Sequence, residues 1–126
     1  MEKILNEGSP KTPTIKVNGE SGVIEISGRS NPENSSELYQ PIMSWLEDYV
    51  ANPAPKTTLN INLEHFNTSS SKCILDILKR CKRLDEGEKE FFVNWYYEDD
   101  DDEMLETAEI YEGMTGLKFE KIPIPE

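Results

Sequence analysis

The sequence predicts an α/β layered fold, a mixed β-sheet covered by helices in the order β-β-α-β-α-β-α-β. Strand-like alternation of apolar and polar residues recurs along the chain, and helical stripes of apolar residues separate the later strands. Turn-forming residues stand between the two kinds of pattern. A hairpin followed by strands that alternate with helices is typical of a mixed sheet with right-handed crossovers.

Length and charge limit what such a domain can do. The chain has 126 residues, which suits one domain, and its formal net charge of −12 opposes nucleic acids and anionic membranes. No window approaches the roughly 18 apolar residues of a membrane span, and the first residues lack the features of a signal peptide. We therefore expect a cytoplasmic protein without membrane insertion, in which Cys73 and Cys81 are small core residues.

The N-terminal part is predicted as an arm followed by a hairpin. Residues 1–13 hold Gly8, two prolines and few apolar residues, so we expect a flexible N-terminal arm, with a single domain over 14–126. Residues 14–17 and 23–27 alternate apolar and polar residues around a glycine-containing loop, which predicts two antiparallel strands.

The first helix is predicted after the turn-forming residues 28–35. Its apolar positions have helical spacing, and Ser35 or Ser36 is a suitable N-cap. Pro41 lies about one turn in, where it costs little if the helix starts late and bends the helix otherwise. The sequence leaves both alternatives open. Two prolines in residues 52–55 end the helix.

The second half alternates strand and helix. Residues 59–63 have a half-buried strand pattern ending at His65-Phe66, and residues 67–71 offer several N-caps for a helix that Gly87 can end. Three further elements follow: an aromatic strand over 91–97, an acidic turn over 98–103 with a helix over 104–111 closed by Gly113 and Gly116, and an edge strand within 117–124.

The hydroxyl-rich segment 67–71 is the main candidate for function. It lies where the carboxyl end of a strand meets the start of a helix, the usual place for sites in such sheets. One interpretation is a helix N-cap with spare serines, and the other is a phosphorylation switch. The residues alone leave both open.

Other chemistry has little support. His65 is the single histidine and has no evident catalytic partner. The acidic run 98–103 lacks the glycine and the final glutamate of a calcium-binding loop, since Met104 and Ile110 occupy those positions. Basic residues are missing beside the aromatic strand, which disfavours nucleic-acid binding. We therefore expect no catalytic residue, no metal and no cofactor.

Two motifs resemble a known family. A strand followed by Asn67-Thr68-Ser69-Ser70 and a helix is similar to the phosphorylated turn of STAS-fold anti-sigma-factor antagonists, although Asn67 replaces an acidic residue and Ser70 a glycine. The chain more closely resembles the SiaC family of bacterial regulatory phosphoproteins. The resemblance is carried by Gly28-x-Ser30-x-Pro32-Glu33-Asn34-Ser35 and by Leu63-x-x-x-Asn67-Thr68-Ser69-Ser70.

The resemblance implies a STAS-like regulatory domain that is not an enzyme. Thr68 would be phosphorylated by a cognate serine/threonine protein kinase and dephosphorylated by a metal-dependent serine/threonine phosphatase. The unphosphorylated form would bind a diguanylate cyclase or another effector and promote cyclic di-GMP synthesis, which controls aggregation and biofilm formation. The alternatives are an anti-sigma-factor-antagonist-type partner switch, or a constitutive protein-interaction domain in which Thr68 is only a helix N-cap.

Further residues are assigned to the site on the same basis. Asn67, Ser69 and Ser70 are expected to form the switch loop and to contact the partner. The earlier motif is a candidate footprint of the kinase or partner, through Ser30, Pro32, Glu33 and Asn34. From the residues alone, this motif is equally well explained as a turn and helix entry, with Asn34 or Ser35 as the cap.

Overall fold

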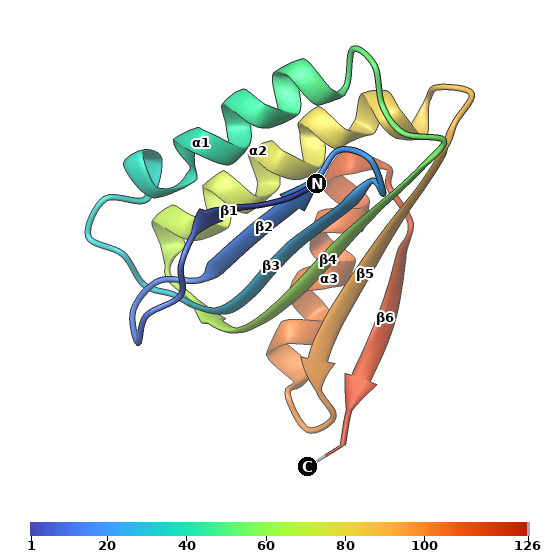
Figure 1. Cartoon of the computed structure of the whole chain (residues 1–126). Helices are drawn as coiled ribbons and strands as arrows, with labels where there is room; N and C mark the ends of the chain where they lie inside the picture. The colour runs from blue at the N-terminus through green and yellow to red at the C-terminus, as the bar shows by residue number, and fades with distance from the viewer. Residues whose placement is uncertain (126) are drawn as a thin grey trace.

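The chain folds into one six-stranded sheet and three helices (Figure 1). The structure is a computed structural model and describes residues 1–125. The strand order follows the sequence, with β1 to β3 antiparallel and β3 to β6 parallel. The predicted α/β fold with a mixed sheet is confirmed. The elements are β1 (Glu2–Asn6), β2 (Thr14–Asn18), β3 (Val23–Ser30), α1 (Ser35–Tyr49), β4 (Lys56–Phe66), α2 (Thr68–Asp85), β5 (Glu90–Glu98), α3 (Asp102–Thr115) and β6 (Phe119–Ile124).

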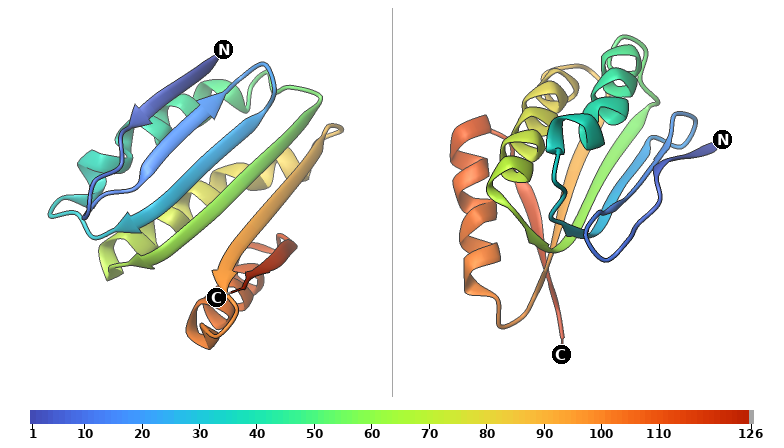
Figure 2. Two further views of the ribbon diagram at one scale, coloured as in Figure 1. Left: turned by 60° about the horizontal axis from the view of Figure 1, so that its bottom comes forward. Right: turned by 90° about the vertical axis from the view of Figure 1, so that its left-hand side faces the viewer.

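All three helices cover the same face of the sheet (Figure 2). Strand residues alternate between the two faces, so every second side chain is buried beneath the helices. The opposite face is open and carries mostly polar residues, including the row Lys16, Glu25, Asn60 and Asn94. In the described residues, no helix is long and apolar enough to cross a membrane.

The N-terminal residues correct one prediction. The expected flexible arm 1–13 contains strand β1, which pairs antiparallel with β2 and forms one edge of the sheet. Backbone hydrogen bonds hold this strand, and such bonds require little apolar sequence. Asn6 strengthens the attachment, because its side-chain amide donates to the Pro13 carbonyl at 2.7 Å. Structure therefore begins twelve residues before Thr14.

Helix α1 does not start late, so Pro41 lies beyond its first turn. The helix starts at Ser35 with Asn34, one of the candidate caps, as its N-cap, and Pro41 lies inside it. Proline lacks an N–H, so the Glu37 carbonyl receives no i+4 hydrogen bond. Both residues are exposed, and water can therefore satisfy that carbonyl.

The other predicted elements are confirmed, with shifted ends. Gly113, a predicted stop, lies within α3, and the helix ends at Gly116, whose φ of 75° is the left-handed conformation that glycine adopts readily. Cys81 is buried in the core as predicted, and Cys73 packs against it half-buried; both are free thiols.

The parallel pairing of β3 with β4 positions the site. The two strands end side by side, with Ser30 opposite Phe66. The residues that follow each strand therefore start from neighbouring points at the same edge of the sheet. Gly28 has a φ of 104° where the pairing shifts by one residue, which explains why this motif begins with glycine.

Candidate functional site

The two sequence motifs meet at the starts of α1 and α2, and Asn67 joins them. Its backbone N–H donates to the Ser30 carbonyl at 2.9 Å, and its side-chain amide donates to the Pro32 carbonyl at 3.2 Å. Its side-chain oxygen accepts from the Ser70 backbone N–H at 2.9 Å and caps α2. One asparagine thus fixes the start of α2 and ties it to the segment that leads into α1.

Five hydroxyl groups form a chain beneath this junction. Ser30 Oγ lies 2.6 Å from Tyr39 Oη and 2.8 Å from Ser70 Oγ. Ser35 Oγ lies 2.6 Å from Ser69 Oγ and 3.3 Å from Ser70 Oγ. We call Ser30, Ser35, Tyr39, Ser69 and Ser70 the hydroxyl cluster. It links the end of β3 to the first turns of both helices.

Four of the five residues of the hydroxyl cluster are buried, and Ser69 is exposed. Ser30 and Ser70 are 0% exposed, and Ser35 is 5% exposed. Burial raises the pKa of Tyr39 to about 12, which outweighs the opposing hydrogen bonds from Ser30 and Ser70. Tyr39 therefore stays a neutral phenol that can donate a proton to its neighbours. Buried hydroxyls without partners would be costly, so these hydroxyls hold one another in place.

Thr68 is different from its neighbours. It is the first residue of α2, and its side chain is exposed. Within residues 1–125, the Thr68 hydroxyl makes no hydrogen bond, whereas Ser71 Oγ donates to the Thr68 carbonyl at 2.6 Å. Of the four consecutive hydroxyls, the one at Thr68 is thus both free and open to solvent.

The structure separates the predicted site residues into two groups. Glu33 and Asn34 are exposed and Pro32 is half-buried, so these residues can be reached from outside. Ser30 and Ser70 are fully buried, so neither side chain is accessible to a partner in this conformation. They point inward because the pleat of β3 and the first turn of α2 place them on the core side.

The structure also rules out an alternative for Thr68. The side chain that caps α2 is that of Asn67, so Thr68 is not the helix N-cap. Asparagine is among the preferred N-cap residues, and here its amide also bonds to the Pro32 carbonyl. A role of Thr68 limited to capping is therefore excluded.

Ser35 and Tyr39 belong to the site, and sequence analysis missed both roles. Tyr39 lies three residues before Ile42 and seven before Leu46, so helical spacing could have placed it on the buried face of α1. A tyrosine on such a face needs a partner for its hydroxyl. The spacing of Tyr39 could thus have predicted a buried tyrosine, but the sequence does not reveal which hydroxyl is its hydrogen-bond partner.

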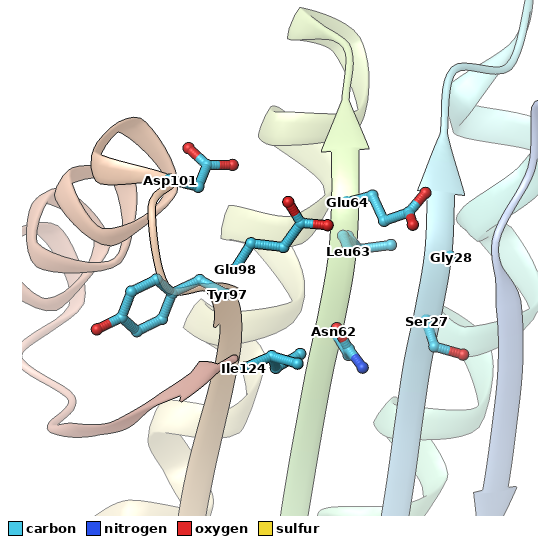
Figure 3. A pocket seen from close by; sticks show the side chains of 9 residues that line it. All are labelled: Ser27, Gly28, Asn62, Leu63, Glu64, Tyr97, Glu98, Asp101 and Ile124. Carbon is cyan, nitrogen blue, oxygen red and sulfur yellow. The ribbon is translucent and has the colours of Figure 1, made fainter. Parts of the chain in front are cut away.

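A notch elsewhere on this edge of the sheet shows no catalytic arrangement. The pairing of β4 with β5 ends at Ile61 and Trp95, and beyond it a cavity of about 400 Å³ opens between the strands (Figure 3). Glu64, Glu98 and Asp101 line it, and their negative charges oppose phosphate-bearing ligands. Among residues 1–125, no group of three or more His, Cys, Asp or Glu side chains could hold a metal ion.

The fold and the site define a small α/β domain whose distinguishing feature is an exposed threonine in a preformed turn. Comparison with known proteins identifies the domain more closely. The family model described as SiaC family regulatory phosphoprotein matches residues 6–124. The chain belongs to this family.

Relatives from Pseudomonas aeruginosa support the assignment. An uncharacterized protein of strain UCBPP-PA14 is 31% identical over 112 residues, which are 89% of each chain. The crystal structure of apo-SiaC matches with 28% identity and a TM-score of 0.84, covering 97% of this chain and 98% of that one. SiaC solved in complex with the diguanylate cyclase SiaD, which it activates, matches with 28% identity and a TM-score of 0.85, covering 93% of this chain and 96% of that one.

Proposed function

We propose that this protein is a non-enzymatic cytoplasmic adaptor that is switched by phosphorylation of Thr68. In its unphosphorylated form it binds and activates a diguanylate cyclase, and so promotes cyclic di-GMP synthesis and biofilm formation. The family assignment supports a regulatory role, and the similar SiaC of Pseudomonas aeruginosa has been crystallised as the activator bound to SiaD. Phosphorylation would release the cyclase.

The free hydroxyl of Thr68 carries the proposal. A kinase needs a hydroxyl oxygen that it can place in line with the γ-phosphorus of a nucleoside triphosphate. That oxygen attacks the phosphorus, the bond to the β-phosphate oxygen breaks, the diphosphate leaves with the electron pair, and a base of the kinase takes the hydroxyl proton. Thr68 meets the requirement for access without any rearrangement, because its side chain is exposed and unbonded.

The start of α2 can accommodate the phosphate within this chain. A phosphothreonine adds a charge of about −1.5 to −2, and the amino end of a helix favours negative charge. Lys72 lies one turn after Thr68 on the same helix, where a cation can face the phosphate. We therefore expect the phosphorylated protein to stay folded.

A bound partner would respond to the same phosphate very differently. A surface that packs against a neutral threonine would have to bury a hydrated dianion, which costs several kcal/mol without a counter-charge. Switching is thus a consequence of desolvation at the interface and requires no change of fold. Asn67 and Ser69 in the turn, with Pro32, Glu33 and Asn34 beside it, form the proposed contact surface for kinase and effector.

Two enzymes are required to operate the switch. A cognate serine/threonine kinase adds the phosphate, and a metal-dependent serine/threonine phosphatase removes it by transferring the phosphoryl group to water. The test is the intact mass of the protein before and after incubation with the kinase and ATP, followed by peptide mapping of the modified site. A single addition of about 80 Da, the mass of HPO₃, at Thr68 is expected. An unmodified Thr68 after treatment with the active cognate kinase would contradict the proposal.

A further inference from the structure

We propose that Ser35 is a specificity-determining residue that selects the phosphate acceptor by holding the neighbouring hydroxyl of Ser69 out of reach. The inference deepens and rests on the proposed function, because it concerns which hydroxyl the kinase modifies. Four hydroxyl residues stand in a row at 68–71, and a kinase that reaches one could reach the next by a small shift. The structure restrains three of them in three different ways.

Burial and helix geometry restrain Ser70 and Ser71. Ser70 is 0% exposed and lies beneath the turn, bonded to the hydroxyls of Ser30 and Ser35. Ser71 is half-buried and donates to the carbonyl of Thr68 within the first turn of α2. Ser70 cannot be presented to a kinase while the helix start remains intact, and Ser71 must first give up its bond to the Thr68 carbonyl.

Ser69 is the critical case because burial does not protect it. The residue is exposed and directly follows Thr68. Its hydroxyl donates to Asn67 Oδ1 at 3.2 Å and lies 2.6 Å from Ser35 Oγ, so Ser35 is the donor in that second bond. The proton and one of the two lone pairs of Ser69 are thus engaged, and the bond to Ser35 holds the oxygen against α1, away from the orientation in which it could be placed in line with a phosphorus atom.

Ser35 holds Ser69 from a separate helix. It is the first residue of α1, is 5% exposed, and is placed by the Asn34 cap, whose side chain accepts from the Glu37 backbone N–H at 3.2 Å. Asn67 also holds Ser69, but it caps α2 as well, so replacing it would disturb the whole turn. Replacing Ser35 leaves the cap of α2 intact and removes, besides the bond to Ser69, only the longer contact of 3.3 Å with Ser70 Oγ, which the Ser70→Ala control also removes.

Peptide mapping of variants treated with the kinase and ATP tests this role. Thr68→Ala removes the normal acceptor, and its residual phosphorylation at Ser69 is the reference rate. In Thr68→Ala/Ser35→Ala, the rate at Ser69 is expected to rise between about twofold and tenfold, as the loss of one hydrogen bond implies. Circular dichroism verifies folding, and Ser35→Cys, which keeps a similar size but bonds weakly, replaces Ser35→Ala if that variant does not fold.

Two controls distinguish a specific restraint from general loosening. Ser36 is exposed and lies next to Ser35, so Thr68→Ala/Ser36→Ala should match Thr68→Ala. Ser70→Ala removes buried hydrogen bonds of the cluster but leaves the bond between Ser35 and Ser69, and in the Thr68→Ala background it too should leave the rate at Ser69 unchanged.

The outcomes separate this inference from the proposed function. Equal rates at Ser69 with and without the Ser35 hydroxyl, or an equal increase in the Ser70→Ala control, would overturn the role of Ser35 while phosphorylation of Thr68 in the wild-type protein stands. A wild-type protein that the kinase leaves unmodified at Thr68 would overturn the proposed function itself, and the acceptor selection with it.

Discussion

Tyr39 is the residue that most clearly joins the stability of this protein to its site. Its buried hydroxyl lies 2.6 Å from Ser30 Oγ, at the end of the hydroxyl cluster. Tyr39→Phe removes that hydroxyl and leaves Ser30 bonded to Ser70 alone. We expect the free energy of unfolding to fall by about 1 to 2 kcal/mol in urea denaturation. Tyr96→Phe, on the open face of the sheet, is the control, and an equal loss there would contradict a special role of the cluster.

Replacement by alanine should lower the free energy of unfolding much less at Thr68 than at Asn67. Thr68→Ala removes a free exposed hydroxyl, so the free energy of unfolding should change by less than about 0.5 kcal/mol. Asn67→Ala removes the cap of α2 and should cost about 1 kcal/mol. Urea midpoints of the two variants measure the difference. A larger loss of stability for Thr68→Ala than for Asn67→Ala would contradict the capping role of Asn67 in this turn.

Glu33 tests the surface beside the switch. It is exposed next to Asn34, and its replacement should slow phosphorylation of Thr68 if the kinase contacts this segment. Glu88→Ala changes an equally charged exposed residue in the turn between α2 and β5 and serves as the control. Asn34→Ala is less informative, because Asn34 also caps α1. Equal initial rates for Glu33→Ala and Glu88→Ala would show that the motif acts only as a helix entry.

At the scale of elements, the sequence patterns predicted all three helices and five of the six strands. Each of these elements buries a stripe or an alternating row, which a pattern of apolar residues reveals. Strand β1 was missed because its residues are exposed or half-buried and backbone pairing with β2 holds it. The start of α1 was predicted only to within two residues, since Asn34, Ser35 and Ser36 are all suitable caps and the structure uses Asn34.

The candidate site was predictable only in part. The two motifs stood out in the sequence, and parallel pairing of β3 with β4 brings them together as the βαβ pattern implies. Contacts between α1 and α2 decide which hydroxyls are buried, and no local pattern encodes them. Ser35 and Ser69 are 34 residues apart in the chain but 2.6 Å apart at their oxygens.

The ion pair between α3 and β6 predicts a pH dependence. Partial burial tends to raise the pKa of Glu112, but hydrogen bonds from Lys121 at 2.6 Å and from the Phe119 backbone N–H outweigh it, so the pKa lies below its ordinary value. A carboxyl with a lowered folded-state pKa adds stability above its unfolded-state pKa and loses it as the pH falls through the folded-state value.

Glu112→Gln should therefore be less stable than the wild type near pH 7, by up to about 1 kcal/mol because the pair is partly exposed. The difference should disappear as the pH falls below the folded-state pKa of Glu112, where the wild-type carboxyl is also neutral. Urea denaturation of both proteins between pH 7 and pH 3 measures it. A difference that stays constant over this range would show that the charge of Glu112 contributes nothing.

At the scale of the whole molecule, the proposed phosphorylation site lies outside the hydrophobic core. The core lies between the sheet and the three helices (Figure 1), while Thr68 is the exposed first residue of α2. A phosphate there would remain in water in the free protein and would have to be desolvated in a complex, so its main consequence would fall on partner binding. With this arrangement, the proposed phosphorylation of Thr68 would change binding without unfolding the domain.

The most direct test is a calorimetric titration of four forms of the protein against a candidate diguanylate cyclase. Wild type and Thr68→Ala should bind with similar affinity, since a neutral side chain is present in both. Thr68→Glu should bind more weakly, and kinase-treated protein most weakly, because glutamate adds one charge and phosphate nearly two. Tighter binding of the phosphorylated form than of Thr68→Ala would contradict the account and would mean that the partner recognises the phosphate through cationic groups.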